Sequence, residues 1–228
     1  YFDYLTFSKD SIKELDIISS YITINETTFF RHPETFEILY HEILSEIFRT
    51  NQDDVIRILS VGCANGAEIY SIAIICKEYM KKYNISRKVK LIGIDIDAEV
   101  LKDAEKGVYQ ERAVLSNIKS INIRLEDYFT KISENQYLLS EEIKSMVIFK
   151  QMNIISAEFP VEFDLIFIRN ILIYYSKEKN DMLIKKMYRM LANKGFLVTT
   201  NTEFIFNYEE FFEIKKNENL QYYRKWTT

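Results

Sequence analysis

The residues best suited to chemistry follow two predicted strands. A turn of small residues, Gly62 to Glu68, comes after the apolar run 58–61 and leads into a predicted helix. Gly62 and Gly66 allow a ligand to approach the backbone, and the start of a helix offers unpaired N–H groups. Asp95 ends the next apolar run, where a carboxylate can accept both ribose hydroxyls of an adenosine-containing cofactor. The turn alone could equally be tight strand-to-helix packing, but turn and acid together indicate an adenosine site.

A second group of polar residues follows a later strand. The run 163–168 ends in Arg169 and Asn170, and Tyr174 and Tyr175 come soon after. Ligands of open α/β sheets bind beyond the carboxyl ends of the strands, so Asn170 and Tyr174 fall where chemistry would take place. The alternatives are that Asn170 caps a turn and that the tyrosines are core or interface aromatics. For Tyr175 we prefer the interpretation that it is a core or interface aromatic.

Other cofactor classes are disfavoured by what the sequence lacks. The first turn has too few glycines for a dinucleotide fingerprint, and no Gly-Lys-Ser/Thr follows it. The chain has two cysteines and two histidines, without the spacing of zinc ligands, so we expect no metal site.

The elements that must position these residues alternate between strand and helix. We predict strands at 56–61, 89–94, 163–168 and 195–200, and helices at 67–83, 98–105 and 177–191, the second capped by Asp97. Two further helices, 9–20 and 33–49, precede them. Hairpin strands at 136–139 and 146–150 indicate an insertion, and 211–214 with 221–225 indicate a closing antiparallel hairpin. The prediction is an α/β fold with a mostly parallel, right-handed twisted sheet.

Composition sets limits on the class of protein. With 228 residues, of which 47% are hydrophobic and 28% charged, the chain can bury one large globular core. The net charge of −4 argues against the broad basic face of a nucleic-acid-binding protein. The sequence has no apolar run of membrane-spanning length and no signal peptide at its start. We therefore expect a cytoplasmic protein that does not insert into membranes. We also expect it to be monomeric.

Several ordered motifs resemble the CheR-type methyltransferases, which esterify glutamates of bacterial chemotaxis receptors with S-adenosylmethionine. The resemblance runs from about residue 20 to residue 205. The matching segments are Thr23 to Arg31, Ile58 to Ile72, Gly93 to Asp97, Gly107 to Tyr109, Met152 to Ile154, and Phe163 to Tyr175. It implies a Rossmann-like class I methyltransferase fold. Residues 1–31 would be a truncated N-terminal helical segment and linker, and 32–228 the catalytic domain, with an inserted β-subdomain at about 128–152.

The resemblance also implies roles for individual residues. The cofactor, S-adenosylmethionine, would be bound by Asn25, Thr27, Arg31, Gly62, Glu68, Asp95, Asn153, Ile154, Arg169 and Asn170. Arg31 and Tyr174 would face the substrate carboxylate, which belongs to the methylation helices of a chemoreceptor. Without the resemblance, a surface pair of Arg31 with Glu34 would be preferred.

The implied chemistry suits a site without histidine, cysteine or metal. A glutamate carboxylate has an ordinary pKa of about 4.3, so at neutral pH it is already the nucleophile and needs no general base. Catalysis is then mostly positioning and dehydration. Two alternatives stay open: a non-catalytic module that binds the cofactor, and a methyltransferase for another substrate. Where the family usually has an acid and a proline, this turn has Ala67 and Ile69, and Thr200 to Glu203 replaces a Gly-His-Ser-Glu stretch.

Overall fold

The computed structural model describes residues 27–117, 123–200, 203, 208–216 and 220–226. The predicted helix 9–20 lies outside the described residues. None of the helices in the described ranges is both long and apolar enough to cross a membrane.

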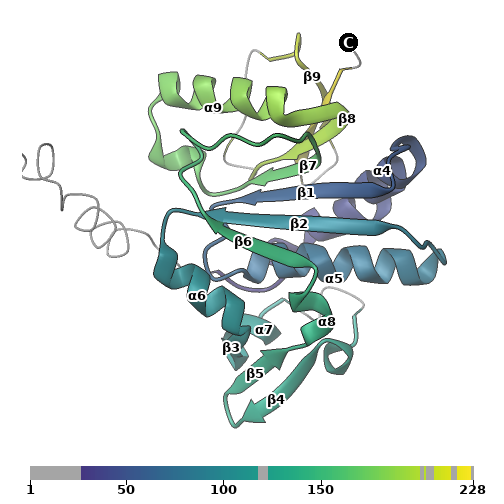
Figure 1. Ribbon diagram of the computed structural model, residues 1–228, viewed down its shortest axis with the longest axis vertical. Helices are drawn as coiled ribbons and strands as arrows, with labels where there is room; N and C mark the ends of the chain where they lie inside the picture. Colours follow the sequence, from purple (N-terminus) through teal and green to yellow (C-terminus); the bar gives the residue numbers. More distant parts are fainter. Residues whose placement is uncertain (1–26, 118–122, 201–202, 204–207, 217–219, 227–228) are drawn as a thin grey trace, which may run out of the picture.

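A seven-stranded sheet forms the centre of the molecule (Figure 1). Its strands are β1 (Val55–Val61), β2 (Lys88–Asp95), β6 (Val147–Gln151), β7 (Phe163–Ile168), β8 (Leu191–Val198), β9 (Phe212–Lys216) and β10 (Gln221–Lys225). They lie in the order β6-β2-β1-β7-β8-β10-β9, and β10 alone runs antiparallel to its neighbours β8 and β9. The strand order reverses between β1 and β7, which makes the carboxyl ends of these two strands the switch point where ligands of such sheets bind.

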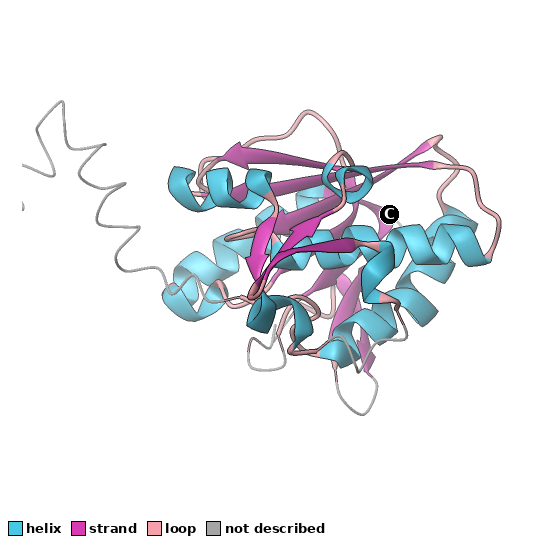
Figure 2. Cartoon of the chain, turned by 90° about the horizontal axis from the view of Figure 1, so that it is seen from below, coloured by secondary structure: helices cyan, strands magenta, loops and turns pink. Residues whose placement is uncertain are grey.

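Helices cover both faces of this sheet, and Figure 2 shows them packed against the strands. On one face lie α3 (Pro33–Ile38), a π-helical turn η1 (Leu39–Ile43), α4 (Leu44–Thr50), α5 (Ala67–Lys82) and α6 (Ala98–Lys106). The other face packs against α9 (Lys177–Met190), through Leu183, Ile184 and Met187. The central strands β1 and β7 are the most buried because a parallel sheet is covered on both sides, and β7 is buried at all six positions.

A small three-stranded antiparallel sheet lies at the opposite end of the molecule from α9 (Figure 1). It consists of β3 (Val108–Gln110), β4 (Phe129–Ser133) and β5 (Gln136–Leu139) in the order β3-β5-β4, accompanied by α7 (Glu111–Leu115), η3 (Leu125–Asp127) and α8 (Glu141–Lys144). The predicted strand 136–139 is confirmed, and its partners are β3 and β4.

The prediction that 146–150 is the other strand of this hairpin is wrong. The segment is β6, which pairs in parallel with β2 from Leu91↔Val147 to Asp95↔Gln151. Its alternating pattern of buried and exposed residues fits an edge strand of either sheet, so the local pattern did not reveal the partner. The predicted closing hairpin is confirmed by the pairing of β9 with β10. The division at residue 31 stays a prediction.

Candidate active site at the carboxyl edge of the sheet

The turn between β1 and α5 is held in a tight left-handed path. Gly62, Ala64 and Gly66 have φ values of 66°, 47° and 83°. The Gly62 N–H donates to the carbonyl of Ile94 at 2.8 Å, which ties the turn to β2. A Cβ at Gly62 would lie 2.2 Å from Cδ1 of Ile171, so that side chain would have to move, and the positive φ favours glycine here in any case. Whether its backbone also faces the cofactor stays a prediction.

Asp95 ends β2 directly beside this turn. Its Oδ2 accepts the N–H of Ala64 at 2.9 Å and its Oδ1 accepts the N–H of Asp97 at 3.0 Å. Burial raises the pKa of Asp95, and the backbone donors oppose that shift. Each carboxylate oxygen can accept a further hydrogen bond, so the acid can serve the turn and a ligand together. Asp97 caps α6 by accepting the N–H groups of Glu99 and Val100, as predicted.

The segment after β6 reaches the same edge. The Met152 N–H donates to the carbonyl of Asp95 at 2.8 Å. Asn153 is exposed and its Oδ1 accepts the N–H of Ile155 at 2.9 Å, whereas the side chain of Ile154 is buried in the core. The contact with Asp95 brings Asn153 and Ile154, both predicted to bind the cofactor, next to the predicted ribose acid.

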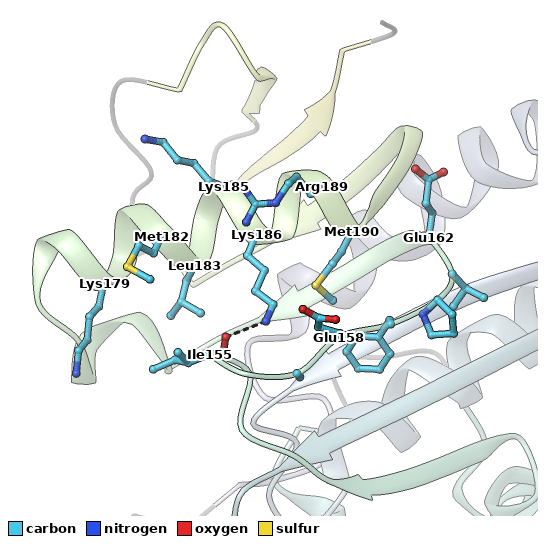
Figure 3. Close-up of a pocket in the computed structure, with 14 residues that line it drawn as sticks. Ile155, Glu158, Glu162, Lys179, Met182, Leu183, Lys185, Lys186, Arg189 and Met190 are labelled. Atoms are coloured by element: carbon cyan, nitrogen blue, oxygen red, sulfur yellow. Dashed lines mark hydrogen bonds between the residues drawn. The ribbon is translucent and has the colours of Figure 1, made fainter.

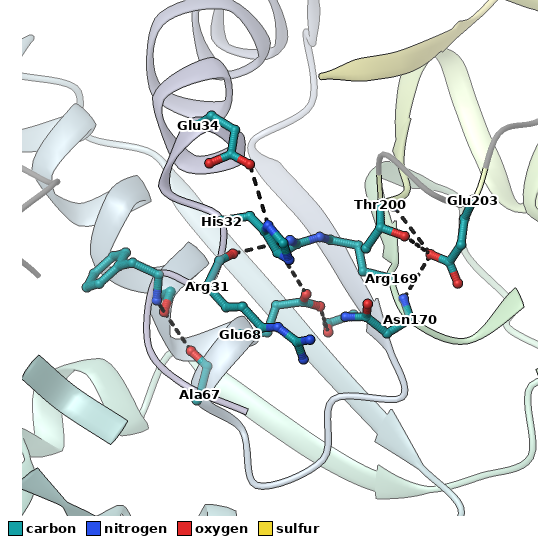
Figure 4. Close-up of polar contacts among 12 residues, drawn as sticks. Arg31, His32, Glu34, Ala67, Glu68, Arg169, Asn170, Thr200 and Glu203 are labelled. Atoms are coloured by element: carbon teal, nitrogen blue, oxygen red, sulfur yellow. Dashed lines mark hydrogen bonds and ion pairs between the residues drawn. The ribbon is translucent and has the colours of Figure 1, made fainter. Parts of the chain in front are cut away.

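A buried ion pair connects the turn to the end of β7 (Figure 4). Glu68 Oε2 lies 3.1 Å from Nη1 of Arg169, and the two side chains are only 15% and 2% exposed. Ser60 donates to Glu68 Oε1 at 2.9 Å. Burial raises the pKa of Glu68, and the guanidinium of Arg169 opposes the shift. Arg169 also donates through Nη2 to the carbonyl of Arg31 at 3.2 Å, so one guanidinium joins three segments of the chain.

The segment that carries Arg31 is anchored on α5. The Phe30 N–H donates to Oγ of Ser71 at 3.0 Å, and that hydroxyl donates to the carbonyl of Ala67 at 2.6 Å. Ala67 is fully buried, so the acid usual in the family would have no solvent at this position. Thr27 is partly buried, and Asn25 lies outside the described residues.

Arg31 itself is exposed and sits between two residues with left-handed backbones, Phe30 at φ 51° and His32 at φ 62°. The expected alternative, a surface pair of Arg31 with Glu34, is not what the structure contains. His32 lies against Glu34, with Nδ1 and Oε1 3.5 Å apart, and the Arg31 side chain projects away from Glu34 in Figure 4.

Glu203 is a residue whose role the sequence left in doubt. Its buried carboxylate accepts the N–H groups of Asn170 and Leu172, both at 2.8 Å, and the hydroxyl of Thr200 at 2.6 Å. These bonds hold the turn in which Asn170 has a φ of 58° and Tyr174 is 59% exposed. The signals in the sequence were its position after the fifth parallel strand and its match to the last residue of the family's Gly-His-Ser-Glu stretch. The residue acts by fixing a neighbouring segment.

Sequence comparisons agree with this geometry. A family model described as CheR methyltransferase, SAM binding domain, matches residues 25–220. A chemotaxis protein methyltransferase from Borreliella burgdorferi is 32% identical over 227 residues, covering 97% of this chain and 76% of that protein. Chemotaxis protein methyltransferase 2 from Vibrio cholerae is 32% identical over 228 residues, covering 98% and 77%.

Solved structures include the N-methyltransferase NodS from Bradyrhizobium japonicum with bound S-adenosyl-L-homocysteine. It overlaps 83% of this chain and 86% of its own at 15% identity and a TM-score of 0.46, and the assignment does not rest on it.

The strand order, the acid at the end of β2 and the matched family model define a Rossmann-like class I methyltransferase that uses S-adenosylmethionine. The chain belongs to the CheR methyltransferase family.

Proposed function

We propose that this protein transfers methyl groups to glutamate side chains on the methylation helices of bacterial chemoreceptors. The observation that carries the proposal is that the residues of the matched family motifs meet at one edge of the sheet. Arg169 contacts Glu68 and the Arg31 carbonyl, and Asp95 contacts Ala64 and the Met152 N–H. The names of the relatives supply the substrate class.

The residues present suit an adenosine cofactor with an amino-acid tail. Asp95 has free acceptor capacity for ribose hydroxyls, and the exposed Asn153 is the candidate for the adenine. Buried Arg169 has an Nε without a partner among the described residues, which leaves a donor beside Glu68 and Asn170 for the polar tail. When bound, S-adenosylmethionine supplies a methyl group made electrophilic by its sulfonium.

The remaining work falls to residues that orient the substrate. The substrate carboxylate is ionised at neutral pH, so no general base is required. We assign Arg31 to a charge-assisted hydrogen bond with this carboxylate and the exposed Tyr174 hydroxyl to a second one. Two donors would hold the nucleophile in line while limiting its hydration.

The test is a methylation assay with the purified chain, labelled S-adenosylmethionine and a chemoreceptor cytoplasmic fragment. We expect label in the receptor that is released by mild base, which identifies a methyl ester, and calorimetric binding of S-adenosylhomocysteine. Absence of cofactor binding would remove the enzyme assignment altogether. Binding without ester formation would favour another substrate or a non-catalytic module.

A further inference from the structure

The face of the sheet that carries α9 contains an open groove (Figure 3). Parallel strands are usually joined by a crossover helix, which also covers the sheet. The crossover from β6 to β7, residues 152–162, is fully described and contains no helix. Between this crossover and α9 lies a cavity of about 740 Å³.

The groove presents apolar side chains to solvent. Met182 on α9 is 63% exposed, and Ile155 and Val161 on the crossover are 40% and 39% exposed. Leu183 and Met190 also line it. These residues come from both walls, so the exposed apolar surface is not one isolated side chain.

The α9 wall of the groove is cationic, with Lys179, Lys185, Lys186 and Arg189. Lys186 donates to the carbonyl of Ile155 at 2.9 Å and fixes the crossover to the helix. Lys179, Lys185 and Arg189 are exposed and have no ion pair with any carboxylate of the described residues. The groove also contains Glu158 and Glu162, but both lie on the crossover wall.

On helix α6, in contrast, exposed lysines form ion pairs with acidic residues of the same helix. There Lys102 pairs with Glu99 at 2.6 Å and Lys106 pairs with Asp103 at 2.7 Å. In a chain with a net charge of −4, a row of cations without such partners beside an apolar strip is complementary to an acidic, amphipathic surface.

One end of the groove adjoins the active site. Ile155 follows Asn153, whose Oδ1 accepts its N–H. Lys179 lies in the first turn of α9, directly after the Asn170 to Tyr174 turn, and its Nζ is 6.0 Å from the ring centre of Tyr175. A helix seated in the groove therefore extends to the edge where Tyr174 is exposed.

We propose that this groove binds an acidic amphipathic helix of the protein substrate, next to the glutamate that is methylated. The proposal rests on the proposed function and names the surface that recognises the substrate. The apolar residues of the helix, repeated at intervals of three and four, occupy the strip of Met182, Ile155 and Val161. Its acidic residues face Lys179, Lys185 and Arg189. The 14 residues of α9 span about 21 Å, enough for a partner helix of several turns.

The experiment compares two charge-reversed double variants in the methylation assay. Lys185→Glu with Arg189→Glu removes the groove cations, and Lys102→Glu with Lys106→Glu makes the same change in charge on α6. We expect the groove variant to raise the KM for the receptor fragment about tenfold or more, because a lost charge complementarity weakens encounter and binding. Its kcat and its affinity for S-adenosylhomocysteine should match the wild type, and the α6 variant should keep the wild-type KM.

An unchanged KM in the groove variant, or an equal rise in both variants, would overturn the proposal. If the wild type forms no methyl ester, the proposed function fails separately, and anisotropy of a labelled receptor fragment still tests the groove: weaker binding by the groove variant alone supports it. Loss of binding to anionic phospholipid vesicles with an unchanged KM would assign the groove to a lipid surface and overturn the proposal.

Discussion

The two ends of strand β7 use the same device for different purposes. Near its amino end, buried Asp164 accepts the N–H of Arg57 at 2.8 Å and the side-chain amide of Asn51, which ties β7 to β1. Just beyond its carboxyl end, Glu203 accepts the N–H groups of Asn170 and Leu172. Both are buried carboxylates that satisfy backbone donors, but the first joins regular strands and the second holds an irregular turn.

Backbone conformation shows what the difference means. Of the six described non-glycine residues with positive φ, Phe30, His32, Ala64 and Asn170 belong to the carboxyl edge. A residue with a Cβ in this region costs about 1–2 kcal/mol relative to its right-handed conformation. Strain of this kind persists where the surrounding contacts enforce it and is concentrated at functional sites. The amino edge therefore mainly stabilises the fold. The carboxyl edge holds residues in strained backbone conformations, which lowers the stability of the folded chain.

Replacing one arginine at each edge should give the largest difference in kcat/KM between two variants. Arg31→Ala should lower kcat/KM for the receptor fragment by about 10²–10³-fold, the usual cost of losing a donor to a reacting oxygen. Arg57→Ala removes an amino-edge arginine whose partner is Asp53 and should leave kcat/KM unchanged. Steady-state kinetics measures kcat/KM for each variant, and a thermal melt checks that each variant is folded. Normal turnover of Arg31→Ala would separate Arg31 from the substrate.

The two buried carboxylates offer the most direct comparison. Glu203→Gln should lower kcat by about 10²-fold, because an NH2 donor would replace one of the two acceptor oxygens that hold the Asn170 to Tyr174 turn, and the turn would shift. Asp164→Asn should lower the free energy of unfolding by about 1–3 kcal/mol and leave kcat unchanged. Chemical denaturation measures the free energy of unfolding of both variants, and steady-state kinetics measures their kcat. Equal kcat losses in the two variants would show that Glu203 acts through general stability alone.

A smaller effect is expected for the acid at the end of β2. Asp95→Ala should weaken S-adenosylhomocysteine binding about tenfold, because hydrogen bonds to a charged acceptor are lost. The control is Asp97→Ala, which should cost about 1 kcal/mol of stability through its helix cap without changing affinity. Calorimetry on the two variants tests the ribose assignment, which would not survive an unaltered affinity in Asp95→Ala.

The smallest expected effect is on pH dependence. Burial raises the pKa of both Glu68 and Asp95, so they take up protons at a higher pH than exposed carboxyls, whose pKa is about 4. Affinity for S-adenosylhomocysteine should therefore fall severalfold as the pH drops from 7 toward about 5. Titrations across this range measure it, and an affinity independent of pH would contradict the assignment.

The same groups have the opposite effect on folding. The pKa of Glu68 and of Asp95 is higher in the folded chain than in the unfolded chain. Their contribution to stability is therefore fully present below the pKa of the unfolded chain, and it is lost as the pH rises through the pKa of the folded chain. Mild acid should therefore weaken cofactor binding without lowering stability through Glu68 or Asp95. Asp164→Asn, at the amino edge, should leave the pH profile of affinity as it is in the wild type.

Features that depend on local sequence could be predicted. The largely apolar runs of β1 and β7 and the Asp97 cap are set by neighbouring residues, and the structure confirms them. The assignment of β6 failed because its partner, β2, is remote in sequence. Glu203 was missed as an anchor because its partners are backbone N–H groups up to 33 residues away, and such donors have no mark in the sequence.

Arg169 has a thermodynamic consequence. Its guanidinium binds both Glu68, which we propose to lie on the cofactor side, and the carbonyl of Arg31, which we propose to lie on the substrate side. A ligand that shifts one of these contacts would change the free energy of the other. Linkage is reciprocal: whatever factor the cofactor applies to the affinity for the acceptor protein, the acceptor applies to the cofactor. One buried side chain would thus couple the affinities for the two ligands by the same factor, whichever of them arrives first.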